Sequence, residues 1–416
     1  MKPHEGIDAV EILEKTVALV LAGGAGARLH PLTADRAKPA VPFGGKYRII
    51  DFTLSNCLHS GLRRVLVLTQ YKSHSLQKHL RDGWSVYNPE LGEYITPVPP
   101  QMRTGESWYT GTADAVYQNL YLLERSGAEW VVILSGDHIY RMDYAAMVRE
   151  HVHNGAAATI ACMKVPLAAA KTFGVVEVDA TTRITSFHEK PNDPCPCPDD
   201  PTQALVSMGV YVFAIKPLLE ALAADHQCSD SSHDFGRDVL PQLVARERLC
   251  AYLFGGETGR VKPDRYWRDV GTIDSYYQAN MDLLRPIPPL NLYQEDWAIR
   301  TYTGQHPPAR TVPGASGSEG ITINSIVASG AVVAGGSVQE SILFSNVFVD
   351  DEAIVQRAVL FDRVRIGRGA HVDHCIIDKG VVVPAGEQIG IDIERDKQRF
   401  QVSPDGVVVI PRGYLF

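Results

Sequence analysis

The chain has 416 residues, of which 45% are hydrophobic, so it is long enough for more than one domain with a substantial core. Its formal net charge of −8 and the lack of a basic cluster argue against a nucleic-acid partner, whose phosphates require concentrated Lys and Arg. No apolar run approaches membrane-spanning length, and the segment from Met1 to Lys15 fits neither a signal nor a transit peptide, so we expect a cytoplasmic protein. Seven cysteines, an odd number, predict no disulfide framework.

A glycine-rich turn follows the first predicted strand. The apolar run from Val17 to Leu21 predicts a buried parallel strand. The turn after it contains three glycines, Gly23, Gly24 and Gly26. Glycines at this spacing can turn several backbone N–H groups toward one phosphate, and Arg28 and Lys38 supply positive charge. The turn is not a P-loop, because no G-K-[ST] follows, and the glycines alone fit an ordinary strand-to-helix turn equally well.

Helices and strands alternate after the turn. Helical spacing of apolar residues runs from Ile49 to Ser60, and the segment from Arg64 to Thr69 predicts the next buried strand. The segment from Gly83 to Trp108 is aromatic and interrupted by prolines, which predicts a long functional loop or lid. Thr112 is expected to cap a helix that ends at Gly127.

A buried strand beginning at Trp130 leads to Asp137, at the edge where open α/β sheets bind ligands. Asp143 is expected to cap a helix that ends at Gly155, and His151 at the end of this helix is expected to be solvated.

The later part of the α/β pattern continues the alternation. A strand is predicted from Ala157 to Lys164, a hairpin from Val175 to His188, and a further strand from Ser207 to Ile215. The block from Tyr266 to Thr272 places Asp269 just ahead of a helix that runs to Leu284. This alternation predicts an α/β fold with a Rossmann-like, doubly wound, mainly parallel sheet.

The pattern changes after residue 285. Residues 286–320 are rich in Pro, Gly and Ser without a period, which predicts an interdomain linker, and residues 321–416 contain apolar residues at steps of six. The repeated positions are Ile326, Val332 and Val338, then Ile342, Phe348, Ile354, Leu360, Ile366 and Val372, then Ile377, Val383 and Ile389. This hexapeptide repeat predicts a C-terminal left-handed parallel β-helix after a catalytic domain of residues 1–285.

Several motifs resemble those of a known family. The string G-G-A-G-A-R-L-H-P-L-T, with a later K-P, resembles the signature of sugar-1-phosphate nucleotidyltransferases, and R-A-K-P-A-V-P-F-G-G-K-Y-R-I-I-D-F is similar to glucose-1-phosphate adenylyltransferases. The blocks G-D-H, S-S-H-D-F-G and Y-W-R-D-V-G-T fit the same family. The resemblance implies an allosterically regulated homotetramer that transfers AMP from ATP to glucose 1-phosphate with Mg²⁺, giving ADP-glucose and pyrophosphate for glycogen synthesis.

The resemblance also implies roles for individual residues. The implied catalytic residues are Arg28, Lys38, Asp137 and Lys190, and the implied metal ligands are Asp137 and Asp269. The implied ATP-binding residues are Leu21, Ala22, Gly23, Gly24, Gly26, Arg28, Lys38, Gln70 and Gly111. The implied glucose 1-phosphate-binding residues are Tyr109, Gly174, Glu189, Lys190 and Ser207. Carboxylate oxygens suit a hard cation such as Mg²⁺, and a lysine suits a sugar phosphate as a mobile point charge.

These residues predict catalysis by positioning and charge. The phosphate oxygen of glucose 1-phosphate is already anionic near neutral pH, so its in-line attack on the α-phosphorus of ATP needs no general base. The absence of a compelling His or Ser constellation agrees with this interpretation.

Regulation is implied by basic residues that match effector-binding positions of the family. They are Arg36, Arg48, Arg125 and Lys379. Ala25, Asp35 and Pro42 stand where the enteric-type enzymes have Arg, Lys and His. Because Asp35 would repel a sugar bisphosphate, we expect an activator other than fructose 1,6-bisphosphate, most simply another phosphorylated metabolite.

Three alternatives stay open. A non-catalytic regulatory subunit would share the fold, although the presence of Arg28, Lys38 and Asp137 favours an enzyme. A uridylyltransferase joined to a hexapeptide acyltransferase would also end in a β-helix, with His371 and His374 as the residues to test. The residues themselves do not separate ATP from UTP or dTTP.

Overall fold

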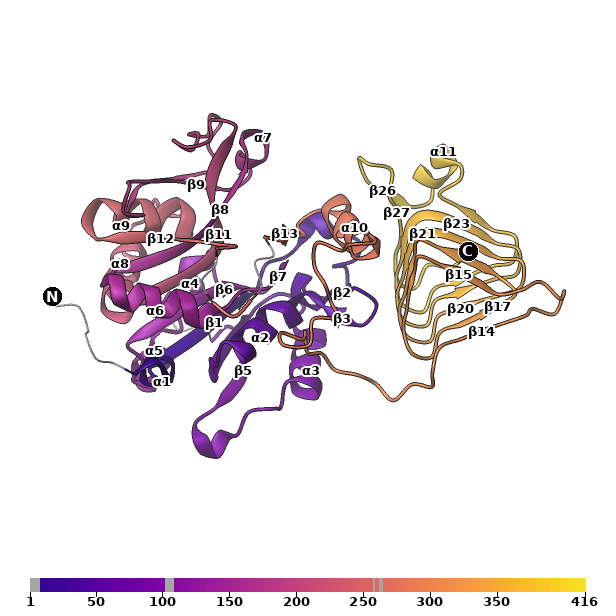
Figure 1. Cartoon of the computed structure of the whole chain (residues 1–416), viewed down its shortest axis with the longest axis horizontal. Helices are drawn as coiled ribbons and strands as arrows, with labels where there is room; N and C mark the ends of the chain where they lie inside the picture. Colours follow the sequence, from indigo (N-terminus) through magenta and orange to yellow (C-terminus); the bar gives the residue numbers. More distant parts are fainter. Residues whose placement is uncertain (1–7, 102–107, 257–258, 262–264) are drawn as a thin grey trace.

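Two architectures follow one another along the chain (Figure 1). The computed structural model describes residues 8–101, 108–256, 259–261 and 265–416. A wide sheet with helices on both faces forms the N-terminal part, and a stack of short parallel strands forms a β-helix at the C-terminal end. The expectation about targeting sequences falls partly on residues 1–7, which lie outside the described residues.

The large sheet confirms the predicted α/β class. Its central path is β10-β9-β11-β6-β1-β4-β5, and β8 and β12 join it through β11. The strands are β1 (Thr16–Ala22), β4 (Arg64–Thr69), β5 (Tyr94–Val98), β6 (Trp130–Ser135), β8 (Ala158–Pro166), β9 (Gly174–Val178), β10 (Ile184–Glu189), β11 (Gln203–Ala214) and β12 (Leu249–Leu253). The strands β5, β4, β1 and β6 run parallel, whereas β11 is antiparallel to β6 and β8. Small two-stranded sheets pair β2 (Pro42–Phe43) with β3 (Tyr47–Arg48) and β7 (His138–Tyr140) with β13 (Trp267–Asp269).

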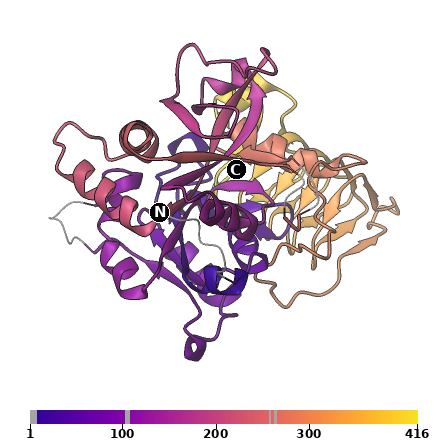
Figure 2. The same ribbon diagram turned by 60° about the vertical axis from the view of Figure 1, so that its left-hand side comes forward.

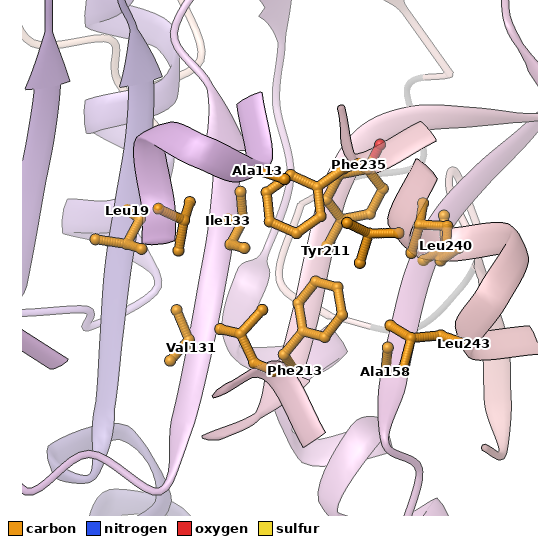
Figure 3. Packing of buried hydrophobic residues seen from close by; sticks show 14 of the residues in the cluster. Leu19, Ala113, Val131, Ile133, Ala158, Tyr211, Phe213, Phe235, Leu240 and Leu243 are labelled. Atoms are coloured by element: carbon orange, nitrogen blue, oxygen red, sulfur yellow. The ribbon is translucent and has the colours of Figure 1, made fainter. Parts of the chain in front are cut away.

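Helices cover both faces of this sheet. They are α1 (Ala9–Glu14), α2 (Ile49–His59), α3 (His74–Gly83), α4 (Thr112–Tyr117), α5 (Leu120–Ser126), α6 (Tyr144–Asn154), α7 (Leu167–Ala170), α8 (Ile215–His226), α9 (Leu240–Arg246) and α10 (Ile273–Met281). Short helical turns are η1 (Ala27–Leu29), η2 (Lys38–Ala40), η3 (Pro89–Leu91), η4 (Phe235–Val239) and η5 (Asp282–Leu284). Val17 and Leu19 pack into one apolar cluster, and Ala18 and Val20 pack into another. Because β1 is buried on both faces, all its residues after Thr16 are apolar, and Figure 3 shows part of the cluster that includes Leu19.

The predicted loop from Gly83 to Trp108 is partly wrong, and its residues 102–107 lie outside the described residues. It contains η3 and the strand β5, which pairs in parallel with β4 from Arg64 opposite Tyr94 to Leu68 opposite Val98. Pro97 lies within this strand. The strand is at the end of the sheet, where a proline is tolerated because the outer edge needs no N–H donor.

The helix predicted from Thr112 to Gly127 is two helices, α4 and α5. The side-chain amide of Asn119 donates to the carbonyl of Ala115 at 2.8 Å, and such side-chain bonds compete with helix continuation. Gly111, not Thr112, is the N-cap of α4, whereas Gly127 ends α5 in the left-handed conformation as predicted.

The helix α6 begins and ends as predicted, but one of its histidines does not lie where we expected. Asp143 caps α6 with its carboxylate, and Gly155 terminates the helix. His151 is 1% exposed and bonds to Thr159 at 2.9 Å, so the expected solvated side chain is buried against the sheet. Burial lowers the pKa of His151 to about 3.

The β-helix confirms the predicted repeat but corrects its spacing. Its strands are β14 (Arg310–Val312), β15 (Ile321–Ile323), β16 (Ile326–Val327), β17 (Val332–Ala334), β18 (Ser337–Gln339), β19 (Ile342–Leu343), β20 (Phe348–Val349), β21 (Ile354–Leu360), β22 (Arg365–Ile366), β23 (His371–Ile377), β24 (Val382–Val383), β25 (Gln388–Ile389), β26 (Gln401–Val402) and β27 (Val408–Ile410), with the helix α11 (Ile393–Lys397). Val355 pairs with Val372, which pairs with Ile389, so one coil takes 17 residues rather than 18. The coil core contains Val333, Val349 and Val355.

The expected inward residues Val332, Phe348 and Ile354 each precede one of these core residues and face outward. A strict step of six therefore drifts out of phase, because the coils take fewer than 18 residues: 17 from Val355 to Val372, and 16 from Val333 to Val349.

The β-helix packs against the α/β part, as both ribbon views show (Figures 1 and 2). One apolar cluster includes Phe43 and Tyr276 from the α/β part and Phe344, Phe361 and Val409 from the β-helix. The predicted division at residues 285 and 320 stays a prediction, and β14, inside the predicted linker, already pairs with β17. Among the described residues, every helix is too short or too polar to cross a membrane, and all seven cysteines are free.

Candidate active site

A cavity of about 290 Å³ opens beside the glycine turn. Its lining includes Leu21, Ala22, Gly24, Gly26, Arg28, Lys38, Asp137 and Gly271. Gly26 has a φ of +61°, which favours glycine, and its carbonyl accepts a bond from the Thr33 hydroxyl at 3.0 Å. A Cβ on Gly24 would meet no atom within 4 Å, so the turn faces open space there. The turn can therefore bring its backbone close to a ligand.

Lys38 lies between two carboxylates at one side of this cavity. Its Nζ donates to Oδ2 of Asp137 at 2.8 Å and to Oδ1 of Asp269 at 3.0 Å. Asp137 follows β6, and Asp269 ends β13, which pairs with β7 so that Asp269 lies opposite His138. The structure thus brings together three predicted residues that are far apart in the sequence.

The charges of this group stabilise one another. Burial would lower the pKa of the Lys38 ammonium, but Asp137 and Asp269 together raise it above the usual lysine value. Burial would raise the pKa of the Asp137 carboxyl, but the Lys38 ammonium lowers it by more, so that it falls to about 2. Asp137 is therefore a carboxylate and Lys38 an ammonium at neutral pH.

The same residues fit a divalent cation. Asp137, His138 and Asp269 offer ligand atoms that all lie within 4.8 Å of one another. The two carboxylates already hold the ammonium of Lys38, and carboxylate oxygens are ligands that hard cations prefer. His138 was missed from the sequence, although it stands in the G-D-H block. Its pKa is lowered, chiefly by burial, so the imidazole is neutral.

Arg28 lines the same cavity, and its guanidinium and the Asp269 carboxylate both lie close to Gly271. A Cβ on Gly271 would lie 3.0 Å from Nη2 of Arg28 and 3.1 Å from Oδ1 of Asp269. A larger residue at Gly271 would therefore displace either the guanidinium or the carboxylate. The exposed Arg28 side chain is placed to meet an anion in the cavity.

The remaining predicted ATP residues form a second group. A Cβ on Gly23 would lie 3.0 Å from Cβ of Gln70, and Nε2 of Gln70 donates to the carbonyl of Tyr109 at 3.2 Å. A Cβ on Gly111 would lie only 2.2 Å from the carbonyl oxygen of His233. Glycine is thus required at position 111 by a close backbone contact.

The predicted sugar residues lie on and around the hairpin β9–β10. Gly174 pairs with Glu189, and Nζ of the exposed Lys190 lies 3.0 Å from Oε1 of Glu189. A Cβ on Gly236 would lie 2.5 Å from Oε2 of Glu189. Gly236 was missed from the sequence as a site residue, although it belongs to the quoted S-S-H-D-F-G block.

Two further predicted sugar residues are buried. The Ser207 hydroxyl accepts a bond from the amide of Gly209 at 3.2 Å, beside an irregularity in the pairing of β11 with β8. The Tyr109 hydroxyl accepts a bond from Asn119 at 3.0 Å, so it faces the start of α5.

Three of the four predicted regulatory residues meet in another cavity, of about 900 Å³, at the junction with the β-helix. These are Arg36, Arg48 and Lys379. The cavity lining adds Lys78, Arg363, Arg365 and Arg412, which the sequence did not single out, and it includes Asp35. Arg125 is exposed on α5, over the ring of Tyr121, and is not part of this lining.

Comparison with known proteins agrees with this geometry. The family model described as nucleotidyl transferase matches residues 17–285, and the model described as GlmU-like, C-terminal hexapeptide matches residues 307–410. Glucose-1-phosphate adenylyltransferase 2 of Vibrio cholerae is 60% identical over 404 residues, covering 97% of this chain and 99% of the relative. The protein of the same name from Vibrio vulnificus (strain CMCP6) is 62% identical over 404 residues, covering 97% and 100%.

A glucose-1-phosphate adenylyltransferase of Methylococcus capsulatus is 49% identical over 399 residues, covering 96% of this chain and 94% of the relative. Nucleotidyltransferases of this kind work with a divalent metal, which the pair Asp137 and Asp269 fits. The chain belongs to the glucose-1-phosphate adenylyltransferase family of nucleotidyltransferases.

Proposed function

We propose that this chain transfers the AMP group of ATP to glucose 1-phosphate, giving ADP-glucose and pyrophosphate for glycogen synthesis. The observation that carries the proposal is Lys38, held between Asp137 and Asp269 beside the glycine turn. This arrangement combines a cation for phosphates with carboxylates for a metal, which is what nucleotidyl transfer requires.

In the proposed reaction, a phosphate oxygen of glucose 1-phosphate attacks the α-phosphorus of ATP. A new oxygen–phosphorus bond forms, the bond from the α-phosphorus to the bridging oxygen breaks, and pyrophosphate carries away the electron pair. No proton is transferred, so no general base is needed. Arg28 and Lys38 stabilise the negative charge that shifts onto the phosphate oxygens, and the backbone of the glycine turn binds the triphosphate.

We propose Mg²⁺ as the metal, held by Asp137 and Asp269. When bound, it would neutralise phosphate charge beside the reacting phosphorus. Lys38 occupies the gap between these carboxylates, so its ammonium can move to the phosphates as its carboxylate partners take a new cation.

We assign substrate selection to two groups of residues outside the Lys38 site. We assign Gln70 and the backbone at Gly111 to the nucleotide, and Glu189 with Lys190 to the sugar; the contacts Gln70–Tyr109 and Glu189–Lys190 place each pair together. The carboxylate of Glu189 can accept bonds from two sugar hydroxyls, and Lys190 supplies a mobile charge for the sugar phosphate.

Regulation is assigned to the basic cavity at the junction. Among the described residues, its lining has seven cationic side chains and one carboxylate, that of Asp35, so it suits an anionic phosphorylated metabolite. Because the Asp35 carboxylate is part of this lining, we keep the prediction that the activator is not fructose 1,6-bisphosphate. We further propose a cytoplasmic homotetramer in which residues 1–285 are catalytic and the β-helix serves assembly and regulation.

The test is pyrophosphate release from the purified chain with glucose 1-phosphate, Mg²⁺ and one nucleoside triphosphate at a time. Pyrophosphate release with ATP alone supports the proposal. A preference for UTP or dTTP would show that the enzyme uses another nucleotide as its substrate. Absence of release with every triphosphate, effectors included, favours a regulatory subunit. Acetyl transfer lost on replacement of His371 or His374 would favour the uridylyltransferase–acyltransferase alternative.

A further inference from the structure

The segment 231–236 lies between the two substrate sides of the proposed site. It follows α8 and includes the first two residues of η4; its residues Ser232 and His233 lie against Gly111, and Gly236 lies against Glu189. Gly111 and Glu189 are more than 70 residues apart in the sequence. Because the segment 231–236 contacts both, the position of Gly111 relative to Glu189 depends on the interactions that fix this segment.

The segment is anchored to Asp225, a 4% exposed carboxylate on α8. Oδ2 of Asp225 lies 2.8 Å from Nδ1 of His233, and Oδ1 accepts the Ser231 hydroxyl at 2.6 Å. The same Ser231 hydroxyl accepts the amide of His233 at 2.9 Å. Both carboxylate oxygens are therefore used, and His233 is held through its ring and its backbone.

This anchor fixes a backbone conformation that histidine seldom adopts. His233 has a φ of +55°, which is unfavourable for a residue other than glycine. In this conformation its carbonyl accepts the amide of Ala113 at 2.8 Å and lies against Gly111. The position of the nucleotide-side backbone thus depends on the carbonyl of His233.

The next residues carry the contact to the sugar side. Oδ2 of Asp234 accepts the Thr112 hydroxyl at 3.0 Å, and Oδ1 accepts the amide of Gly236 at 2.9 Å. A Cβ on Gly236 would lie 2.5 Å from Oε2 of Glu189, so the Gly236 backbone packs directly on this carboxylate. A continuous route therefore runs from Gly111 through His233 to Glu189.

We propose that His233 and Asp225 are positioning residues, which hold the nucleotide side and the sugar side of the site at a fixed separation. This inference rests on the proposed function, because Gly111 and Glu189 are assigned to the two substrates there. Neither residue needs to touch a substrate, so both act through the backbone of the segment 231–236.

The test uses three replacements of His233 and one of Asp225. His233→Asn keeps a donor, because the asparagine Nδ2 takes the place of Nδ1, and asparagine tolerates positive φ. His233→Gly tolerates the backbone conformation but loses the anchor, and His233→Ala loses both. We expect both KM values to rise about tenfold or more in His233→Ala, in line with the loss of a hydrogen bond to a charged group.

We expect the KM values to rise less in His233→Gly than in His233→Ala. In His233→Asn we expect them to lie within about threefold of the wild-type values. Asp225→Asn should raise both KM values, and combining it with His233→Ala should add little, because the two residues act as one unit. His153→Ala is the matched control: this exposed histidine lies in the last turn of α6, outside the segment, and the KM values of the variant should not change.

A second measurement is independent of activity. Hydrogen exchange at the amides of Ala113 and Gly236 should accelerate together in His233→Ala and stay slow in His233→Asn. Wild-type KM values in folded His233→Ala, or an Asn variant no better than Ala, would overturn the inference. If the wild-type chain releases no pyrophosphate, the proposed function fails, while exchange at the two amides still decides whether His233 links them.

Discussion

Lys38 and Lys379 are two largely buried lysines whose surroundings have opposite effects. Their side chains are 8% and 26% exposed, and their Nζ atoms lie 2.8 Å from Asp137 and 2.7 Å from Asp362, respectively. A second carboxylate, that of Asp269, raises the pKa of Lys38 despite burial. Burial lowers the pKa of Lys379, Asp362 offsets this only in part, and nearby arginines lower it further.

The difference indicates what each place can bind. Around Lys38 the protein supplies its own anions, and an arriving cation can share them. Around Lys379 positive charge is in excess, because Arg36 and Arg48 contribute to the same cavity, so an arriving anion would relieve repulsion. We therefore propose that the same residue type serves a metal and phosphate site in one place and an anion site in the other.

Removing a carboxylate from the Lys38 site is expected to have the largest effect. Asp137→Asn should lower kcat by about 10²- to 10³-fold, as for loss of a preorganised electrostatic contact, and should raise the Mg²⁺ concentration needed for half-maximal rate. Pyrophosphate release measured across a Mg²⁺ series checks both effects. Asp405→Asn, an exposed carboxylate in the β-helix part, is the control, and near wild-type turnover in Asp137→Asn contradicts the metal assignment.

Removing Arg28, the exposed cation beside Asp269, is expected to lower kcat by a similar factor but to leave the Mg²⁺ requirement unchanged. Arg28→Ala should lower kcat by about 10²- to 10³-fold without altering the Mg²⁺ requirement, because Arg28 meets phosphate oxygens rather than the metal. Arg28→Lys keeps the charge but loses the guanidinium fork, so it should recover only part of the rate. Equal activity of the Ala and wild-type enzymes would remove Arg28 from the mechanism.

At the junction cavity the expected effect is on anion binding. Lys379→Met should raise the Kd for inorganic phosphate at this cavity about tenfold, as for loss of a charge-assisted hydrogen bond. Calorimetric titration checks this, with Arg125→Ala as a matched cationic control outside the cavity. If Arg125→Ala weakens phosphate binding as much as Lys379→Met, the assignment of the cavity is wrong.

The smallest effect is the pH dependence that follows from the lowered pKa of Lys379. A lysine loses its charge as pH rises through its pKa, so phosphate affinity should be full below that pKa and fall above it, at a pH below the usual lysine value of about 10.5. The total decline should be about tenfold, as for Lys379→Met, because the affinity stops falling once Lys379 is neutral. Lys379→Arg should bind phosphate equally at pH 7.5 and 9.5, because arginine stays charged, and a parallel decline in both proteins would exclude Lys379 as its cause.

The local sequence pattern predicted element boundaries correctly where hydrophobic periodicity and the capping or turn residues indicated the same boundary. The apolar run at β1, the cap at Asp143 and the glycine after α5 each predicted a boundary that the structure confirms. The local pattern failed where contacts made in the folded chain override it. The strand β5 pairs at the edge of the sheet despite Pro97. The side chain of Asn119 interrupts the helix that was predicted to continue across it. His151 is buried although its neighbours suggested a solvated helix end.

The sequence by itself determined the α/β class, the β-helix and the glycine turn with its cations, because these follow from short-range periodicity and motif spacing. Only the tertiary structure decided which charges meet. Lys38 reaches Asp269 because β13 pairs with β7, and Arg36 bonds both oxygens of Asp378 across the junction, at 2.9 and 3.0 Å. Such contacts join residues hundreds of positions apart, and their energy depends on burial and on partners that no local pattern contains.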